Sequence, residues 1–306
     1  GYVSFARIPP TFAAASMMAT GFSSLIKSST AFCSRKSSSD ILLELGHKCD
    51  VVVPDAFPGF LLWMKGTSEI LVFENDAQKV EEAISEADLI FSLDYNRLDR
   101  IAAVGDLVQK ASATKLLIDH HIDPAEFEHM LSDTKASSTA ELVYDFVNEL
   151  GWGDHIDADV ASCMYAGIMT DTGSFKYPST TSHTHRVAAE LIDRGLVATE
   201  VHQEIFDTNS FNRLQLIGYA LTNKLEFDKS SGVAIISLSK DEKLRFEFKK
   251  GDTEGLVNYG LSINGSRMAV FLSEEVGFTK MSFRSKGDLD VNVIARAHFN
   301  GGGHKN

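Results

Sequence analysis

Short apolar runs alternate with stretches of helical periodicity through the first half of the chain. Four runs of the kind that form buried strands occur at residues 51–53, 70–73, 89–93 and 116–118. Residues 76–87 carry a helical stripe with Asp76 as a candidate N-cap. Residues 138–150 carry another, which begins at Ser137 or Ser138, has Glu141 at capping-box spacing and stops at Gly151. Alternating strands and helices predict a parallel sheet with helices on both faces.

A change of pattern near residues 224–232 predicts a second domain. Residues 157–222 have the periodicity of consecutive helices with breaks at Pro178, Gly195 and near Asn209, and we expect the last helix, 210–224, to be a connector. Beyond it, residues 232–238, 268–273 and 278–283 are strand-like and 291–299 are helical. We therefore predict an α/β fold, with a parallel-sheet domain, helical wall and connector helix at 41–224 and a smaller α/β domain at 230–306.

Composition and charge narrow the class of protein. The chain has 306 residues, 44% of them hydrophobic, which suffices for two cores, and no apolar run approaches the roughly 18 residues of a membrane span. Its three cysteines include no CxxC pair, so neither a disulfide framework nor a thiolate zinc site is indicated, and we expect a cytoplasmic protein. The net charge of −13 argues against binding of long duplex nucleic acid but leaves short anionic ligands open.

Three apolar segments of the chain each end in an acidic residue. Asp94 follows one predicted strand, Asp119-His120-His121 follows the next, and Asp171 ends a helical stretch. Each acid alone has an ordinary alternative as a helix N-cap or a turn residue. Together they predict a cation site, because the carboxyl ends of parallel strands open into one crevice and buried acids are costly unless paired or metal-bound. Imidazole and carboxylate suit Mn, Fe or Zn ions.

These residues carry a family resemblance. Leu93-Asp94, Ile118-Asp119-His120-His121 and Met169-Thr170-Asp171-Thr172-Gly173-Ser174-Phe175 resemble motifs two, three and four of the DHH phosphoesterases, and Gly301-Gly302-Gly303-His304 resembles the glycine-rich signature of the associated DHHA1 domain. The resemblance spans about residues 42–306. With Ser137-Ser138-Thr139 and residues 251–255, it is strongest to the branch of bifunctional oligoribonucleases and 3′-phosphoadenosine 5′-phosphate phosphatases.

The resemblance implies a role for each acid and imidazole. Two divalent cations, commonly Mn²⁺ with Mg²⁺ or another divalent ion as an alternative, would share Asp94 as a bridge, and His120 and Asp171 would be further ligands. His121 would face the scissile phosphate. Asp119 would orient His120, because a ligating histidine needs its other ring nitrogen fixed. His183 and His185 also have ligand-type side chains, but we expect them to be polar groups at a helix start.

In the second domain, a further set of residues is expected to bind the substrate. Cationic side chains and exposed backbone N–H groups of this kind bind terminal phosphates. The alternatives are a solvated strand edge for the cations and a plain flexible turn for the glycines. The candidates are Arg284, Ser285, Lys286, Asn292, Gly301, Gly302, Gly303 and His304. The chain stops soon after them, so we expect this domain to be C-terminally truncated.

Residues 1–40 depart from the pattern that the family implies. Motif one of the family supplies up to three metal ligands, yet no His precedes His47 and no Asp precedes Asp40. A presequence, a natural loss of the motif or a frame error would each explain this. The frame error is favoured because the codons of Met17-Met18-Ala19-Thr20, read one base earlier, encode Asp-Gly followed by Asp, Asn, His or Tyr. Without motif one the protein ligands are too few for a stable two-metal site.

The sequence thus predicts a metal-dependent phosphoesterase that hydrolyses short single-stranded RNA, the 3′-phosphate of adenosine 3′,5′-bisphosphate, or both. A cyclic or linear dinucleotide phosphodiesterase is an alternative on the same scaffold. The other alternative, of a different class, is a catalytically impaired nucleotide-binding remnant, which the missing motif one would produce. We expect no membrane partner, and a homodimer remains open.

Overall fold

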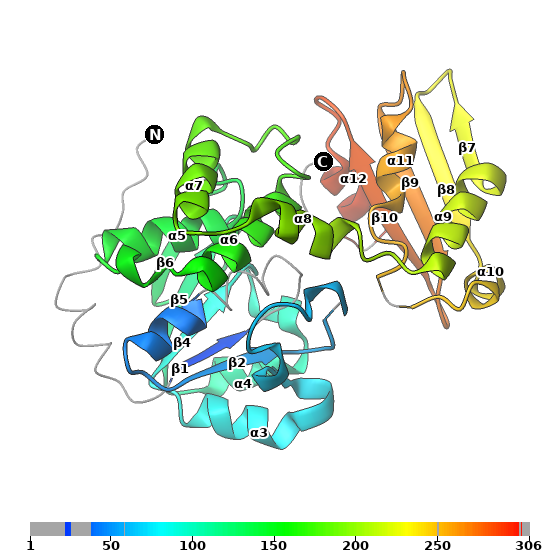
Figure 1. The fold of residues 1–306 in the computed structure, drawn as a ribbon. Coiled ribbons are helices and arrows are strands. Elements are labelled where there is room, and N and C mark those ends of the chain that lie inside the picture. Colours follow the sequence, from blue (N-terminus) through cyan, green and yellow to red (C-terminus); the bar gives the residue numbers. More distant parts are fainter. Residues whose placement is uncertain (1–21, 26–37, 58, 250, 300, 302–306) are drawn as a thin grey trace. The chain divides into compact units, whose positions relative to one another are not determined.

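The chain forms two compact units, residues Gly1–Asp207 and Thr208–Asn306 (Figure 1). The structure is a computed structural model and describes residues 22–25, 38–57, 59–249, 251–299 and 301. The atypical segment 1–40 lies largely outside the described residues, as do Gly302, Gly303 and His304 of the glycine-rich signature. The predicted α/β fold is confirmed.

A six-stranded sheet in the order β3-β2-β1-β4-β5-β6 organises the first unit, and every neighbouring pair in it is parallel. All four predicted strand runs are present. The strand β1 lies between β2 and β4, so the atypical first segment does contribute a strand to the sheet centre. The strands are β1 Phe22–Leu25, β2 Cys49–Val53, β3 Leu71–Val72, β4 Leu89–Leu93, β5 Thr114–Asp119 and β6 His129–Ser132.

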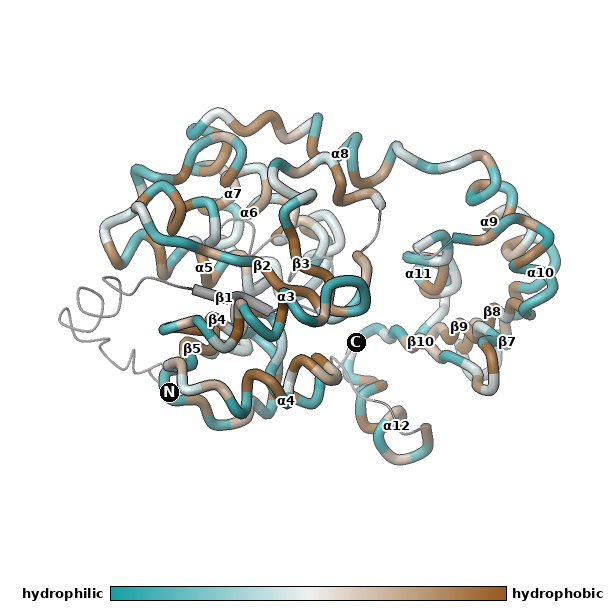
Figure 2. Tube along the Cα trace, turned by 90° about the horizontal axis from the view of Figure 1, so that it is seen from below, coloured by the Kyte–Doolittle hydropathy of each residue, from teal (hydrophilic) through white to brown (hydrophobic). Residues whose placement is uncertain are grey.

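Helices cover both faces of this sheet because its strands are apolar on both sides. Val52 and Ile90 pack with Val80 of α3 and Val104 of α4 on one face. On the other face, strand residues such as Phe91 pack with α5 and α6. Figure 2 shows brown hydrophobic positions recurring between teal ones along α4, the pattern of an amphipathic helix. The helices of this unit are α3 Phe73–Ser85, α4 Ala103–Lys110, α5 Thr139–Glu149, α6 Ala158–Asp171, α7 Ser182–Asp193 and α8 Ala198–Phe206.

Local signals in the sequence set several helix ends. Ser138 is the N-cap of α5, and its side chain accepts a hydrogen bond from the Glu141 N–H, as the capping spacing predicts. Gly151 follows this helix with φ 76°, a left-handed conformation that favours glycine. Asp76 differs from its prediction, because α3 starts at Phe73 and bends at Asp76. Short 3₁₀ turns complete the unit: η1 Gly59–Leu61, η2 Thr67–Glu69, η3 Leu98–Ile101 and η4 Gly153–His155.

The second unit is a four-stranded sheet in the order β10-β9-β8-β7, in which only β8 and β9 are parallel. Helices α9 and α11 pack on it through Leu216, Leu256 and Val257. The predicted connector helix, α9, therefore groups with this unit. A Cβ added at Gly260 of α11 would lie 3.0 Å from the Ala234 Cβ, so the close approach of α11 to the sheet depends on this glycine. The elements are α9 Phe211–Asn223, β7 Leu225–Asp228, β8 Val233–Leu238, α10 Lys240–Arg245, α11 Leu256–Ser262, β9 Met268–Glu274, β10 Thr279–Ser285 and α12 Val291–His298.

Glu242 ties α10 to α9 and gives the second unit a pH-dependent stability. Its carboxylate accepts hydrogen bonds from the Tyr219 hydroxyl (2.7 Å), the Lys224 ammonium (3.0 Å) and the Ser239 N–H (2.8 Å). Burial alone would raise the pKa of Glu242, but these hydrogen bonds and the Lys224 charge lower it to about 2. Because the folded pKa lies below the ordinary value, the carboxylate stabilises the fold above about pH 4.5 and loses this effect as the pH falls toward 2.

We expect Glu242→Gln to lower the free energy of unfolding of the second unit by about 1–3 kcal/mol at pH 7, because an amide accepts these hydrogen bonds less strongly. The difference from the unmodified protein should shrink as the pH falls from 4.5 toward 2. Urea unfolding at pH 7 and pH 3, followed by circular dichroism, measures it. Asp241→Asn, on the first turn of the same helix, is the matched control and should show little effect; an equal loss in both variants would contradict the assigned contacts.

Among the described residues, no helix combines the length and the apolar character needed to cross a bilayer.

Candidate active site

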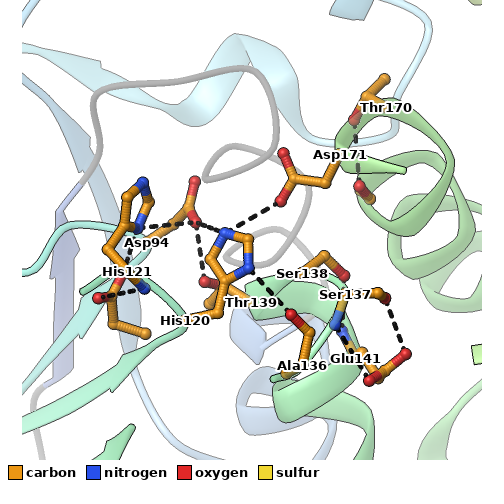
Figure 3. A network of polar contacts seen from close by, with 12 residues as sticks. Asp94, His120, His121, Ala136, Ser137, Ser138, Thr139, Glu141, Thr170 and Asp171 are labelled. Carbon is orange, nitrogen blue, oxygen red and sulfur yellow. Dashed lines mark hydrogen bonds and ion pairs between the residues drawn. The ribbon is translucent and has the colours of Figure 1, made fainter. Parts of the chain in front are cut away.

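The acids and imidazoles singled out in the first unit meet at one edge of its sheet. Asp94 directly follows β4, Asp119 is the last residue of the neighbouring β5, and His120 and His121 come next. Because these strands are parallel and adjacent, their carboxyl ends lie together, and the Asp94 N–H bonds to the Ile118 carbonyl at 3.1 Å. Asp94 has φ 62°, an uncommon left-handed conformation for a residue other than glycine. The last residue of α6, Asp171, joins them (Figure 3).

His120 stands at the centre of the cluster. Its Nε2 lies 3.3 Å from the Asp171 Oδ2 and 3.6 Å from the Asp94 Oδ1. All three side chains are largely buried, with exposed fractions of 8% for His120, 21% for Asp171 and 3% for Asp94. The His121 Nδ1 lies 3.9 Å from the Asp94 Oδ1, and one donor atom from each of Asp94, His120 and His121 fits within 4.8 Å. Ligand-type atoms gathered this closely can hold a divalent cation.

A backbone carbonyl fixes the orientation of His120. Its Nδ1 lies 3.3 Å from the Ala136 carbonyl oxygen. With the proton on Nδ1 as donor to this carbonyl, the Nε2 lone pair faces the two carboxylates, which is the tautomer that a metal ligand needs. The predicted partner of His120 was Asp119, and here the structure differs from the prediction.

Asp119 orients His121 instead. Its fully buried carboxylate accepts the His121 N–H at 2.9 Å through Oδ2 and pairs with the His121 Nδ1 at 2.8 Å through Oδ1. Burial lowers the pKa of the His121 imidazole, but the Asp119 hydrogen bond and the charges of Asp94, Asp119 and Asp171 outweigh it and raise the pKa. The His121 Nδ1–H thus donates to Asp119, which fixes the ring from one side, and the raised pKa favours a second proton on Nε2.

The start of α5 supports Asp94. The Thr139 hydroxyl donates to the Asp94 Oδ1 at 2.8 Å, inside the buried part of the site. The preceding turn is held by Glu141, whose carboxylate accepts the Ser137 hydroxyl at 2.7 Å, and by Ser138 as N-cap (Figure 3). Residues 137–139 resemble a family segment, but the sequence assigned Thr139 no contact. The Ala136 carbonyl has no sequence signal at all, because every residue has one.

A tight turn fixes the end of α6, where Asp171 lies. Gly173, Ser174 and Phe175 have φ values of 56°, 62° and 62°, so two residues other than glycine are left-handed in succession. The Thr172 hydroxyl accepts the Phe175 N–H at 3.0 Å and donates to the Ile168 carbonyl at 2.7 Å. A Cβ on Gly173 would lie 2.5 Å from the Tyr177 ring, so the turn also depends on this glycine for space. Such strain persists only where the surroundings enforce it.

The predicted substrate residues of the second unit divide into exposed and internally bonded groups. Arg284, on β10, and Lys286, just after it, are exposed. Ser285 and Asn292 are each 5% exposed; the Ser285 hydroxyl donates to the Leu289 carbonyl at 2.6 Å, and the Asn292 Oδ1 accepts from the Arg296 Nε at 2.7 Å. The Gly301 N–H donates to the Ala295 carbonyl. The two exposed cations are therefore the better candidates for contacting an anion.

His183 and His185 make contacts of their own, to Asp145 and to Phe175. Both are in the first turn of α7. The His183 Nε2 lies 3.0 Å from each carboxylate oxygen of Asp145 on α5, so this contact connects α7 to α5. His185 stacks on the Phe175 ring, with centroids 5.4 Å apart.

Two family models match the chain, each over one of the described units. The DHH family, N-terminal domain, matches residues 14–168, and the DHHA1 domain matches residues 229–306. The first match contains Asp94, Asp119, His120 and His121, and the second contains Arg284 and Gly301.

Curated proteins and solved structures give the same grouping. A bifunctional oligoribonuclease and PAP phosphatase, NrnA, of Bacillus subtilis is 31% identical over 267 residues, which are 85% of this chain and 82% of that protein. An exopolyphosphatase-related protein from Bacteroides fragilis has a crystal structure that superposes with a TM-score of 0.94 at 34% identity and covers 100% of this chain and 91% of its own. RecJ of Thermus thermophilus, in complex with Mn²⁺, shares the fold at a TM-score of 0.53 and 11% identity, over 97% of this chain and 50% of RecJ.

Proposed function

We propose a specific reaction for this chain, which belongs to the DHH family and carries a DHHA1 domain. By its family it is a phosphoric ester hydrolase that acts on nucleotides. The proposal is that it shortens very small RNA oligonucleotides and removes the 3′-phosphate from adenosine 3′,5′-bisphosphate. The name of the 31%-identical Bacillus subtilis protein, an oligoribonuclease and PAP phosphatase, supports both substrates.

One observation carries this proposal: the carboxylates of Asp94 and Asp171 lie 3.6 Å and 3.3 Å from the His120 Nε2. Two carboxylates and an imidazole are a donor set for Mn²⁺, Fe²⁺ or Zn²⁺. We infer that these three residues hold a divalent cation, and the Mn²⁺ complex of RecJ supports manganese. When bound, the cation would lower the pKa of a water and neutralise charge on the phosphoryl oxygens.

The other residues of the site would position the reacting groups. Thr139 would keep the Asp94 carboxylate turned toward the cation, and the Ala136 carbonyl would keep the His120 Nε2 lone pair there. His121, whose Nδ1–H donates to Asp119, would donate from a protonated Nε2 to the phosphate that is cleaved. No side-chain nucleophile is needed, because water attacks the phosphorus.

In the second unit, we propose that Arg284 and Lys286 bind a phosphate of the substrate. Both side chains are exposed on or beside β10. A guanidinium forms two parallel hydrogen bonds to a phosphate, which suits a terminal phosphate better than an ammonium alone. Two local cations also offset the net charge of −13, which would otherwise repel nucleotides.

The test is release of nucleoside monophosphate from a trinucleotide RNA, and of phosphate from adenosine 3′,5′-bisphosphate, with Mn²⁺ present. We expect turnover that chelator abolishes and added Mn²⁺ restores. A cyclic dinucleotide is the comparison substrate, and faster turnover of it than of the trinucleotide would favour the phosphodiesterase alternative.

A second candidate is a nucleotide-binding protein that has lost catalysis. The observation that favours it is the absence of any Asp, Glu or His between Gly1 and Ser39, where the family carries metal ligands. It predicts that adenosine 3′,5′-bisphosphate binds in a calorimeter without being hydrolysed. Hydrolysis that depends on Mn²⁺ and is lost in Asp171→Ala would rule it out.

A further inference from the structure

The turn that follows His121 is not held by burial of its own side chains. Ile122, Asp123 and Pro124 are all exposed, and the Ile122 side chain is 43% exposed. Asp123 has φ 54°, a left-handed conformation that is uncommon outside glycine, and lies in a bend of the chain. A turn with exposed side chains and a strained residue needs hydrogen bonds to adopt one conformation.

Asn96 supplies such hydrogen bonds from the loop that follows β4. Its side-chain Nδ2 donates to the Ile122 carbonyl at 2.6 Å and lies 3.4 Å from the Asp123 carbonyl. Its own backbone carbonyl accepts the Ala125 N–H at 2.8 Å. Asn96 is only 7% exposed, so water competes little for these bonds. One residue thus contacts three of the four positions that follow His121.

The buried amide of Asn96 is kept although half of it is unused. Its Oδ1 is buried and has no hydrogen-bond partner among the described residues. A buried acceptor without a partner destabilises the fold. The donor side of the amide must therefore matter, and an isosteric residue without that donor would be a poor substitute.

We propose that Asn96 is a positioning residue for His121. Asp119 holds the His121 backbone N–H and ring from the preceding side. Asn96 holds the carbonyl of the next residue, Ile122, from the following side. Two anchors on either side of one residue leave its backbone little freedom, so the direction of the imidazole is set by both. This role rests on the proposed function of His121 as the group that contacts the phosphate.

Two variants separate the donor from the mere presence of a side chain. Asn96→Asp keeps the shape but turns an oxygen toward the Ile122 carbonyl, which repels it, whereas Asn96→Ala removes both. A displacement of a catalytic group by about 1 Å costs on the order of 10²-fold in rate. We expect both variants to lower kcat by about 10–100-fold. KM and the Mn²⁺ dissociation constant should stay within about threefold, because Asn96 is not proposed to contact substrate or cation.

A double-mutant cycle tests whether Asn96 acts through His121. If it does, Asn96→Ala should cause almost no further loss in a His121→Ala background. Equal losses in both backgrounds would show a general structural role and overturn the proposal. Asn148→Asp is the chemical control, since its Nδ2 also donates to a backbone carbonyl, that of Tyr144 at 2.9 Å, and it should keep full activity.

Hydrogen exchange followed by mass spectrometry gives a readout that needs no turnover. We expect amides in residues 121–126 to exchange at least about tenfold faster in Asn96→Asp than in the unmodified protein, with α5 unchanged. Unchanged exchange at residues 121–126 would overturn the proposal that Asn96 positions His121. If the unmodified protein hydrolyses none of the substrates, the proposed function fails, and the exchange result still decides whether Asn96 orders the turn.

Discussion

Asp171→Ala is expected to lower kcat by about 10²–10³-fold and to weaken Mn²⁺ binding by a similar factor. We expect no other substitution of a proposed metal ligand that leaves the sheet intact to cause a larger loss. Asp171 ends α6 and is 21% exposed in its side chain, so its removal disturbs packing little, whereas Asp94 is fully enclosed beside β4. Its carboxylate contacts the same His120 nitrogen as Asp94 does. Without it, the proposed cation keeps one carboxylate and one imidazole, too few to hold it tightly.

Turnover of the trinucleotide and calorimetric titration with Mn²⁺ measure the two effects separately. Asp145→Ala is the matched control: it also removes a carboxylate that pairs with a histidine on the first unit, at 3.0 Å from His183, but outside the cluster. We expect the control to keep its activity and Mn²⁺ affinity. An Asp171→Ala protein with unchanged Mn²⁺ affinity would refute the ligand assignment.

The fold could be predicted because its signals are local. Buried parallel strands are continuous apolar runs, and residues 89–93 were predicted at the bounds that β4 has in the structure. The short strand β3 was predicted too long, since Phe73 already begins α3. The strand β6, His129–Ser132, has no buried residue, and the helices α10 and α11 are short, so these elements lack a pattern strong enough to be recognised.

The composition of the site could also be predicted, but not its pairing. Strand ends bring Asp94 and Asp119 to one edge whatever their side-chain torsions are. Which histidine Asp119 contacts depends on those torsions and on the turn after the strand, and neither is encoded in a three-letter motif. The same holds for Asn96, whose type is common in loops and whose partners lie 26 residues away and farther.

The second large effect is expected for Asp119→Asn, a change that keeps the shape of a fully buried side chain. Asp119 accepts two N–H groups of His121, from the backbone at 2.9 Å and from the ring Nδ1 at 2.8 Å. Asparagine has one acceptor and one donor. With its oxygen on the backbone N–H, its amide N–H₂ faces the ring Nδ1, which must then be unprotonated. The ring keeps an Nε2–H for the phosphate but loses the positive charge that two N–H groups give it. A neutral donor stabilises a phosphoryl group less than a charged one, so kcat should fall by about 10²-fold.

The position of Asp119 also predicts what should not change. It contacts His121 and not His120, so the Mn²⁺ dissociation constant of Asp119→Asn should stay within about threefold of the unmodified value. Asp145→Asn, which makes the same exchange beside His183, is the control and should leave kcat and the Mn²⁺ dissociation constant unchanged. A variant that loses Mn²⁺ affinity instead of kcat would mean that Asp119 acts on the cation through His120, as the family resemblance implied. Retained affinity with a lost rate would place the two histidines in different roles, one holding the cation and the other contacting the phosphate.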